Sequence, residues 1–210
     1  MPVDFKKQFK EFYLPPATPG IVTVPAANFL CVRGAGDPNE EDGAYAHALE
    51  LLYGVAYTIK MSPKAGHAID GYFEYVVPPL EGFWWIDGLA SMDVARKADL
   101  SWMSCIRLPD FASRDVFGWA IEQATRKKKM DFSPVEYLTL DEGVCVQCMH
   151  VGPYDAEPAT TAAMDAYAVE KGYVLDFSDV RHHHEIYLGD PRRTAPEKLR
   201  TVIRHPIRKA

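Results

Sequence analysis

The chain has 210 residues, of which 48% are hydrophobic and 25% are charged, and its formal net charge is −6. This balance is typical of a globular protein, and it excludes a disordered chain, a collagen-like fibre and a coiled coil. The net negative charge disfavours nucleic acid as a general partner.

The sequence predicts neither a membrane span nor a secretory signal. No apolar run approaches the roughly 18 residues that a membrane-spanning helix needs. The first twelve residues carry Asp4 and Glu11 and lack an uninterrupted apolar stretch. We therefore expect a cytoplasmic protein with no membrane partner. Basic residues gather in 191–210, and we interpret this segment as a solvated final strand.

Two segments of the chain repeat the same order of predicted elements. The first, approximately 20–112, predicts a strand at 28–34, a helix at about 43–61, and strands at 72–78 and 102–109. The second, approximately 135–208, predicts a strand at 144–150, a helix from Pro158 to Gly172, and strands at 184–188 and 201–206. Between them, a helix over approximately 114–129 follows Ser113, a residue type that caps helices.

The repeat predicts an α+β fold made of two pseudo-twofold βαββ units. Ile106-Arg107-Leu108-Pro109 echoes Ile203-Arg204-His205-Pro206, and Glu74 and Glu185 fall at matching places in their predicted strands. Each unit alone would be small for a core, so we expect the two antiparallel sheets to pair into a single domain over 1–210. Pseudosymmetric halves leave a cleft at their junction, where ligands bind.

Cysteines and histidines in this chain do not indicate a metal site. Cys145 and Cys148 form a CxxC, but they lie in an alternating, β-branched stretch that predicts a strand, on which their sulfurs point to opposite faces. We interpret them, with Cys31 and Cys105, as core thiols. On a strand, His182 and His184 share one face and His183 takes the other. We expect no metal and no cofactor.

Aromatic side chains, 12% of the chain, cluster in and near the predicted elements. Core packing explains any one of them, whereas together they could form a cage for flat or cationic organic molecules. The members of this set are Tyr53, Tyr57, Trp84, Trp85, Trp102, Trp119 and Tyr187.

Glu185 lies among apolar and aromatic residues and, on a strand, shares a face with His183 and Tyr187. Loss of hydration there should raise the pKa of its carboxyl group. The carboxylate would then be a counter-charge for a cationic ligand or a general base. Alternatively, it is satisfied by a buried hydrogen bond or by Arg107 or Arg204.

Six stretches carry a resemblance to a known family. They are LLYGVAYTIK, GYFEYVVPPLEGFWW, SWMSCIRLPDF, VQCMHVGPYDAEP, HHEIYLGDPRR and TVIRHPI. In this order, over about residues 20–208, they resemble stand-alone members of the GyrI-like small-molecule-binding superfamily. The resemblance implies two βαββ units around an aromatic pocket with a central glutamate. The first strand begins within about 30 residues of the start, which implies a free-standing binder or enzyme rather than a DNA-binding regulator.

Within that superfamily, the chain most resembles the cyclopropanoid cyclopropyl hydrolases, which open the cyclopropane of DNA-alkylating antibiotics of the duocarmycin and yatakemycin type. The resemblance implies that Glu185 takes a proton from water and that Tyr53 or Tyr57 hydrogen-bonds the dienone oxygen. The ligand-binding residues would be Trp84, Trp85, Trp102, Trp119, His183 and Tyr187.

The alternative function is a non-catalytic multidrug-binding protein that sequesters aromatic or cationic compounds. A gyrase inhibitor acting by protein contact is disfavoured, because the sequence marks no exposed partner surface. We expect hydrophobic aromatic or cationic small molecules as partners and a monomer or weak homodimer.

Overall fold

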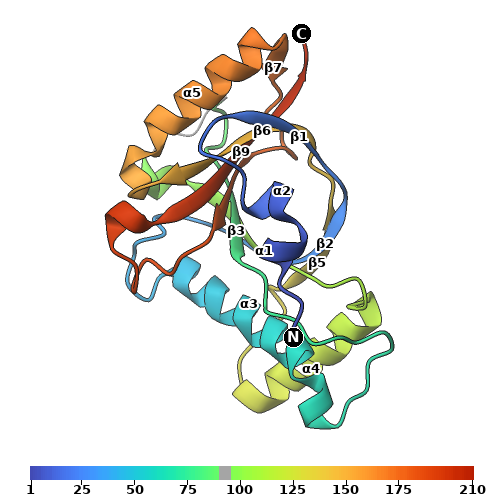
Figure 1. The fold of residues 1–210 in the computed structure, drawn as a ribbon. Helices are drawn as coiled ribbons and strands as arrows, with labels where there is room; N and C mark the ends of the chain where they lie inside the picture. The colour runs from blue at the N-terminus through green and yellow to red at the C-terminus, as the bar shows by residue number, and fades with distance from the viewer. Residues whose placement is uncertain (90–95) are drawn as a thin grey trace.

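A computed structural model describes residues 1–89 and 96–210, and a curled antiparallel sheet organises it (Figure 1). The strand order is β1 (Gly20–Val24), β6 (Gly143–Val151), β9 (Arg200–Lys209), β8 (His183–Tyr187), β3 (Leu80–Trp85), β4 (Ser101–Arg107), β2 (Ala27–Ala35) and β5 (Glu136–Leu140). The short strand β7 (Tyr173–Leu175) pairs with the end of β9. The sheet therefore runs through both repeats.

The two predicted repeats are present as β2–α3–β3–β4 and β6–α5–β8–β9, with α3 spanning Ala44–Lys60 and α5 spanning Glu157–Glu170. They meet where β3 pairs with β8, which sets Gly82 opposite Glu185. The halves also exchange edge strands, since β1 pairs with β6 of the second half and β5 pairs with β2 of the first. The pseudo-twofold α+β fold predicted from the sequence is confirmed.

Helices cover both faces of the sheet. On one face lie α3 and α5, and α4 (Arg114–Lys128) packs against α3 (Figure 1). On the other face, α1 (Phe5–Gln8) and α2 (Lys10–Tyr13) bury Phe5 and Tyr13 against Ile186 and Val202. Four 3₁₀ turns complete the elements: η1 (Ser62–Ala65), η2 (Lys97–Asp99), η3 (Tyr154–Ala156) and η4 (Pro196–Lys198).

Local signals explain where the long helices begin and end. Ser113 caps α4 by accepting a hydrogen bond from the backbone N–H of Val116 at 3.3 Å, as predicted. Gly172 follows α5 with φ +79°, a conformation that glycine adopts without a steric penalty. No helix among the described residues is both long enough and apolar enough to cross a membrane.

The strand predicted at 72–78 is wrong. This segment is irregular apart from a bridge between Val3 and Tyr75, and the strand of the first repeat is β3, which begins at Leu80. Tyr75 is buried and produces the alternating pattern, but Pro78 and Pro79 cannot donate ladder hydrogen bonds. Glu74 is exposed, so the proposed match between Glu74 and Glu185 is also wrong.

The interpretation of the cysteines is confirmed, because all four are free and buried. Cys148 packs beside Met164 of α5, whereas the thiol of Cys145 meets the backbone oxygen of Glu142 at 3.5 Å. Burial raises the pKa of the Cys145 thiol to about 12 and that of the Cys148 thiol to about 11. These thiols are therefore poor nucleophiles.

The histidine run alternates between the two sheet faces, as predicted. His182 stacks on Trp85, with ring centroids 4.1 Å apart, and His184 stacks on Phe83 at 4.0 Å. His183 points to the face that carries α3 and α5, where it meets Glu185.

Candidate active site

A cavity of about 850 Å³ lies between α3 and the N-terminal end of α5, over the strands where the two halves meet. Its size falls within the roughly 300–1,000 Å³ of drug-sized ligand sites. The described side chains around it include Tyr45, Leu49, Tyr53, Tyr57, Trp84, Tyr154, Glu157, Glu185 and Tyr187. Aromatic and aliphatic side chains therefore form much of the wall, and two buried carboxyl groups, those of Glu157 and Glu185, lie among them.

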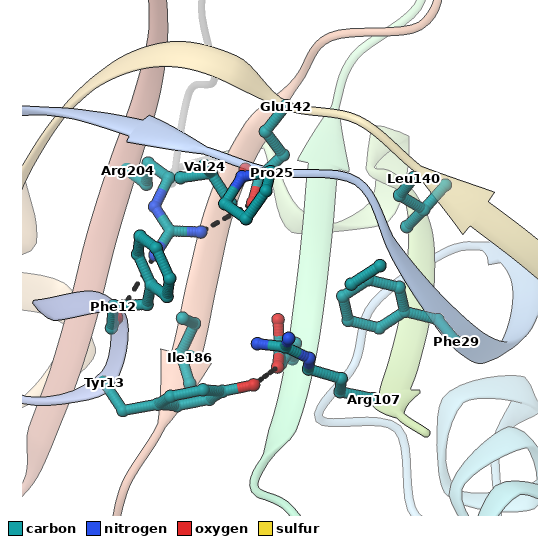
Figure 2. A pocket seen from close by; sticks show the side chains of 12 residues that line it. Phe12, Tyr13, Val24, Pro25, Phe29, Arg107, Leu140, Glu142, Ile186 and Arg204 are labelled. Atoms are coloured by element: carbon teal, nitrogen blue, oxygen red, sulfur yellow. Dashed lines mark hydrogen bonds and ion pairs between the residues drawn. The ribbon is translucent and has the colours of Figure 1, made fainter. Parts of the chain in front are cut away.

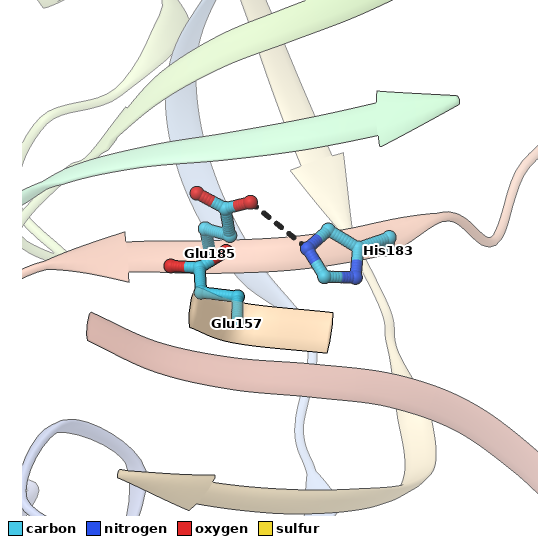
Figure 3. A group of neighbouring side chains, drawn as sticks. All are labelled: Glu157, His183 and Glu185. Atoms are coloured by element: carbon cyan, nitrogen blue, oxygen red, sulfur yellow. Dashed lines mark hydrogen bonds and ion pairs between the residues drawn. The ribbon is translucent and has the colours of Figure 1, made fainter. Parts of the chain in front are cut away.

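Glu185 lies at the floor of the cavity, on β8. Its Oε1 is 2.9 Å from Nε2 of His183, and Figure 3 shows the two side chains turned toward each other from the same strand. Burial alone would raise the pKa of Glu185, but hydrogen bonds with His183, Tyr187 and Glu157 and the charge of His183 outweigh it and lower that pKa. The expected upward shift is therefore wrong, and Glu185 is an ionised carboxylate at neutral pH.

Glu157, the first residue of α5, is the second buried carboxyl group of the cavity. It is buried, and Figure 3 shows it beneath Glu185. Burial and the neighbouring negative charge of Glu185 raise the pKa of Glu157 to about 10. Glu157 is thus a neutral acid beside an ionised base, an arrangement in which environment gives two carboxyl groups different roles.

Aromatic side chains lie beside Glu185 in the cavity. Nε1 of Trp84 donates a hydrogen bond to the hydroxyl of Tyr187 at 2.8 Å. The ring of Tyr45 lies 5.4 Å from that of Trp84. Gly82 makes this packing possible, because a Cβ at this position would lie 2.6 Å from Nε1 of Trp84. The negative charge of Glu185 also helps to raise the pKa of Tyr154 to about 12, after the larger effect of burial.

The two tyrosines predicted for catalysis line the wall formed by α3. Tyr53 is half-buried, and Tyr57 lies toward the opening with 49% of its surface exposed. Burial is the main cause that raises the pKa of Tyr53, and its nearest charges are those of Asp190 and Arg192 at the cavity rim. Both side chains therefore line the cavity on the wall formed by α3.

Three predicted ligand-binding tryptophans lie elsewhere. Trp85 lies on the opposite sheet face, against His182. Trp102 is in the core beneath Tyr45, with ring centroids 5.1 Å apart, so it supports the cavity wall from behind. Trp119 lies on α4 and stacks on His67 at 3.8 Å. The cavity therefore brings together Glu185, Tyr53, Tyr57, Trp84 and Tyr187, with His183 directly behind Glu185.

Arginine does not pair with Glu185 among the described residues. Arg107 and Arg204, the echoed arginines, approach a small cavity on the opposite sheet face from two sides (Figure 2). There Nη1 of Arg204 donates a hydrogen bond to Oε1 of Glu142 at 2.5 Å. Burial opposes ionisation of Glu142, but Arg204 and His184 outweigh it and lower the pKa of Glu142 to about 2. Glu185 is instead satisfied by buried hydrogen bonds.

The group formed by Glu157, His183 and Glu185 offers one ligand atom each within 4.8 Å of one another, and could hold a cation. Both ring nitrogens of His183, however, already have partners, since Nδ1 lies 2.7 Å from Nε2 of His205 and Nε2 meets Glu185. A metal ligand keeps one ring nitrogen for the ion, so this geometry suits proton transfer better than coordination.

Sequence reasoning missed Glu157, Tyr45 and Tyr154. Glu157 immediately precedes Pro158, and an acidic residue at the start of a helix is ordinarily an exposed partner of the helix dipole. Tyr45 lies in the helix predicted at about 43–61, where its helical spacing marks it only as a core residue. Their place beside Glu185 depends on the pairing of β3 with β8, which links residues about 100 positions apart.

An aromatic cavity with a buried carboxylate, formed at the junction of two pseudosymmetric halves, defines a small-molecule-binding protein. The model of the GyrI-like small molecule binding domain matches residues 17–208. The chain belongs to the GyrI-like family.

Solved structures agree with this assignment. An uncharacterized conserved protein from Listeria innocua is 45% identical with a TM-score of 0.92, over 98% of this chain and 100% of that chain. A hydrolase from Listeria innocua is 44% identical with a TM-score of 0.90, over 99% of this chain and 100% of that chain. The C-terminal domain of EcmrR, at 13% identity and a TM-score of 0.54 over 92% of this chain and 98% of that one, shares the fold alone. No curated protein matches the chain.

Proposed function

We propose that the protein is a hydrolase that opens the strained cyclopropane of DNA-alkylating antibiotics of the duocarmycin and yatakemycin type by adding water. The observation that carries the proposal is the ionised Glu185 beside the protonated Glu157 at the floor of the cavity. A site that only captures cations needs a negative charge, but it does not need a neutral acid held against that charge. The likeness to a Listeria innocua hydrolase supports the same reaction class.

In the proposed reaction, the electrophile is a cyclopropane conjugated to a dienone. Glu185 takes a proton from a water molecule as the water oxygen bonds to the ring methylene. The bond between that methylene and the spiro carbon breaks, and its electron pair moves through the ring to the dienone oxygen. The dienone oxygen then accepts a proton from solvent, and Glu185 returns its proton to solvent, which gives a phenol and a net addition of one water.

The tyrosines of α3 are the proposed partners of the dienone oxygen. This oxygen lies across the ring from the cyclopropane, so its partner must be displaced from Glu185 along the ligand. Tyr53 meets this requirement better than Tyr57, because it is half-buried whereas Tyr57 is exposed at the opening. Trp84 and Tyr187 present aromatic surface beside Glu185, on which a flat ligand can stack.

A modest rate enhancement suffices for this chemistry, because ring strain already drives it. General-base catalysis contributes typically 10²–10⁴-fold, and positioning of the water adds to it. Such a reaction needs a placed base and a hydrogen-bond donor, both of which the cavity offers.

The test is single-turnover conversion of a cyclopropane-containing duocarmycin-type compound, followed by mass spectrometry in water and in H₂¹⁸O. The proposal expects a product heavier by one water, labelled by the solvent oxygen, with the wild-type protein but not with buffer. Saturable quenching of tryptophan fluorescence without conversion would instead make the protein a sequestering binder, and would refute the proposed hydrolysis.

A further inference from the structure

A chain of hydrogen bonds leads from Glu185 to the outer surface of α5. Oε1 of Glu185 is 2.9 Å from Nε2 of His183, and Nδ1 of His183 is 2.7 Å from Nε2 of His205. Nδ1 of His205 is in turn 2.6 Å from Oδ1 of Asp165. The three inner side chains are buried, whereas 31% of the Asp165 side chain is exposed. The chain therefore joins the cavity floor to solvent.

The alternation of residues along the strands produces this chain. Glu185 and His183 are two residues apart on β8, and His205 lies on the same sheet face of the neighbouring strand β9. Asp165 projects from α5, which covers that face. The intervening His184 and Arg204 point to the other face, where they meet Glu142.

The geometry also determines how many protons the chain holds. Two ring nitrogens only 2.7 Å apart cannot both present lone pairs, so one proton lies between His183 and His205. If that proton belongs to His183, the Nε2 of His183 either donates to an ionised Glu185 or accepts from a protonated one. If that proton belongs to His205, the Nδ1 of His205 either donates to an ionised Asp165 or accepts from a protonated one.

Each neutral imidazole carries one proton, and the three hydrogen bonds together hold one more. This extra proton has four possible positions. The proton can reside on Glu185, His183, His205 or Asp165, and each move shifts it within a hydrogen bond that already exists. None of these moves breaks a contact or rotates a side chain.

We propose that Asp165 and His205 are positioning residues that act through His183 to keep Glu185 ionised, by holding the extra proton of these hydrogen bonds away from its carboxylate. The inference rests on the proposed function, because it concerns the proton that Glu185 removes from water. With the extra proton on His183, His205 or Asp165, Nε2 of His183 donates a hydrogen bond to Oε1 of the ionised Glu185. The carboxylate then takes the proton of the water at its other oxygen, Oε2, and later returns that proton to solvent in the cavity. Glu185 is then ionised for the next turnover.

Several other groups face this chain and set the balance of its protons. Glu157 at the start of α5, Tyr154 of η3, Tyr45 of α3 and Tyr187 of β8 surround Glu185, and the ring of Phe177 lies 5.0 Å from that of His205. Burial lowers the pKa of His205, more than the adjacent Asp165 raises it. His205 therefore depends on the Asp165 carboxylate to carry a proton.

The test compares Asp165→Asn with two other variants. Asp165→Glu keeps a carboxylate, and Glu170→Gln is the matched control, because Glu170 lies on the same helix with 70% of its side chain exposed. The first readout is the pH dependence of the single-turnover rate. The second is the affinity for the neutral hydrolysed product. The third is the ¹⁵N–¹H spectrum of the unliganded protein with labelled histidines.

Without the Asp165 carboxylate, a proton on the imidazoles loses its stabilising charge and remains on Glu185. The rate of Asp165→Asn should fall by about 10- to 100-fold, as for other carboxylates that orient a functional histidine. The acidic limb of its pH profile should move to higher pH while product affinity is unchanged. Asp165→Glu should recover the wild-type profile, and Glu170→Gln should match it throughout.

An Asp165→Asn profile identical to that of the wild type would overturn the proposed role of Asp165, and so would equal losses of rate and product affinity. The spectrum of the unliganded protein separates this outcome from failure of the proposed function. A proton coupled to nitrogens of both His183 and His205 supports the chain even if no compound is converted. A spectrum in which His183 and His205 share no proton would refute the proposed role of Asp165 and His205 even if hydrolysis occurs.

Discussion

Replacement of Glu157 by glutamine should stabilise the protein, although it changes a cavity residue. The wild-type carboxyl group has a pKa of about 10 when folded, against an ordinary 4.5, because of its burial and the charge of Glu185. Folding at pH 7 therefore requires that Glu157 take up a proton that the unfolded chain lacks. This uptake costs about 1.4 kcal/mol for each pH unit above 4.5, or about 3 kcal/mol at pH 7. Glutamine avoids this cost and keeps a neutral hydrogen-bond donor beside Glu185.

The sign of the effect fixes its pH dependence. Since the folded pKa is raised, the wild type loses stability relative to Glu157→Gln as pH rises from 4.5 toward 10. The difference should be below about 1 kcal/mol at pH 5 and about 3 kcal/mol at pH 7. For a chain of this length, the latter corresponds to an increase of about 6–12 °C in Tm.

Thermal and urea unfolding of the two proteins at pH 5, 6, 7 and 8 measures this difference, with Glu170→Gln as the control for an exposed glutamate. Parallel stability curves over this range would refute the reasoning, because they would mean that Glu157 is ionised in the folded state. A less stable Glu157→Gln at pH 7 would refute it more strongly.

Three further predictions concern residues around the site. Glu142→Gln should lower the free energy of unfolding by about 3 kcal/mol at pH 7, because its folded pKa is about 2; the difference should disappear as pH falls through that value, which unfolding curves against pH will check. Gly82→Ala should displace Trp84 and weaken ligand binding by at least about tenfold, measurable by calorimetry; unchanged affinity would contradict the packing that a 2.6 Å contact demands. Trp84→Phe should abolish most quenching of tryptophan fluorescence by a bound aromatic compound, whereas Trp119→Phe should leave the quenching in place; the reverse pattern would move the ligand away from this cavity.

Patterns within single elements predicted much of the fold from the sequence. Ser113, Pro158 and Gly172 mark helix ends through chemistry that acts over a few residues, and the observed ends of α4 and α5 follow them. The strand at 72–78 failed for the opposite reason. Its alternating pattern reflects burial of Tyr75 beside Val3, a contact with the distant N-terminus, whereas β3 contains Gly82, a residue disfavoured in strands.

Only the part of the site that lies on a single strand was predictable from the sequence. Glu185 stands out from the sequence because a carboxylate between apolar neighbours on a strand must be buried. Glu157, Asp165 and His205 carry no such signal, since each looks like an ordinary polar residue at its position. Only the packing of α5 against β6 and β9, together with the pairing of β9 with β8, brings them beside Glu185, and these contacts join residues far apart in sequence.

The central claim is that Glu185 acts as a base rather than as a counter-charge. The most direct test measures single-turnover conversion of a duocarmycin-type cyclopropane by Glu185→Gln beside its affinity for the neutral hydrolysed product and for a cationic dye. If Glu185 is the base, conversion by Glu185→Gln should fall by about 10²-fold or more while its affinity for the neutral product is unchanged. Conversion at the wild-type rate, with only the cationic dye bound more weakly, would contradict this claim.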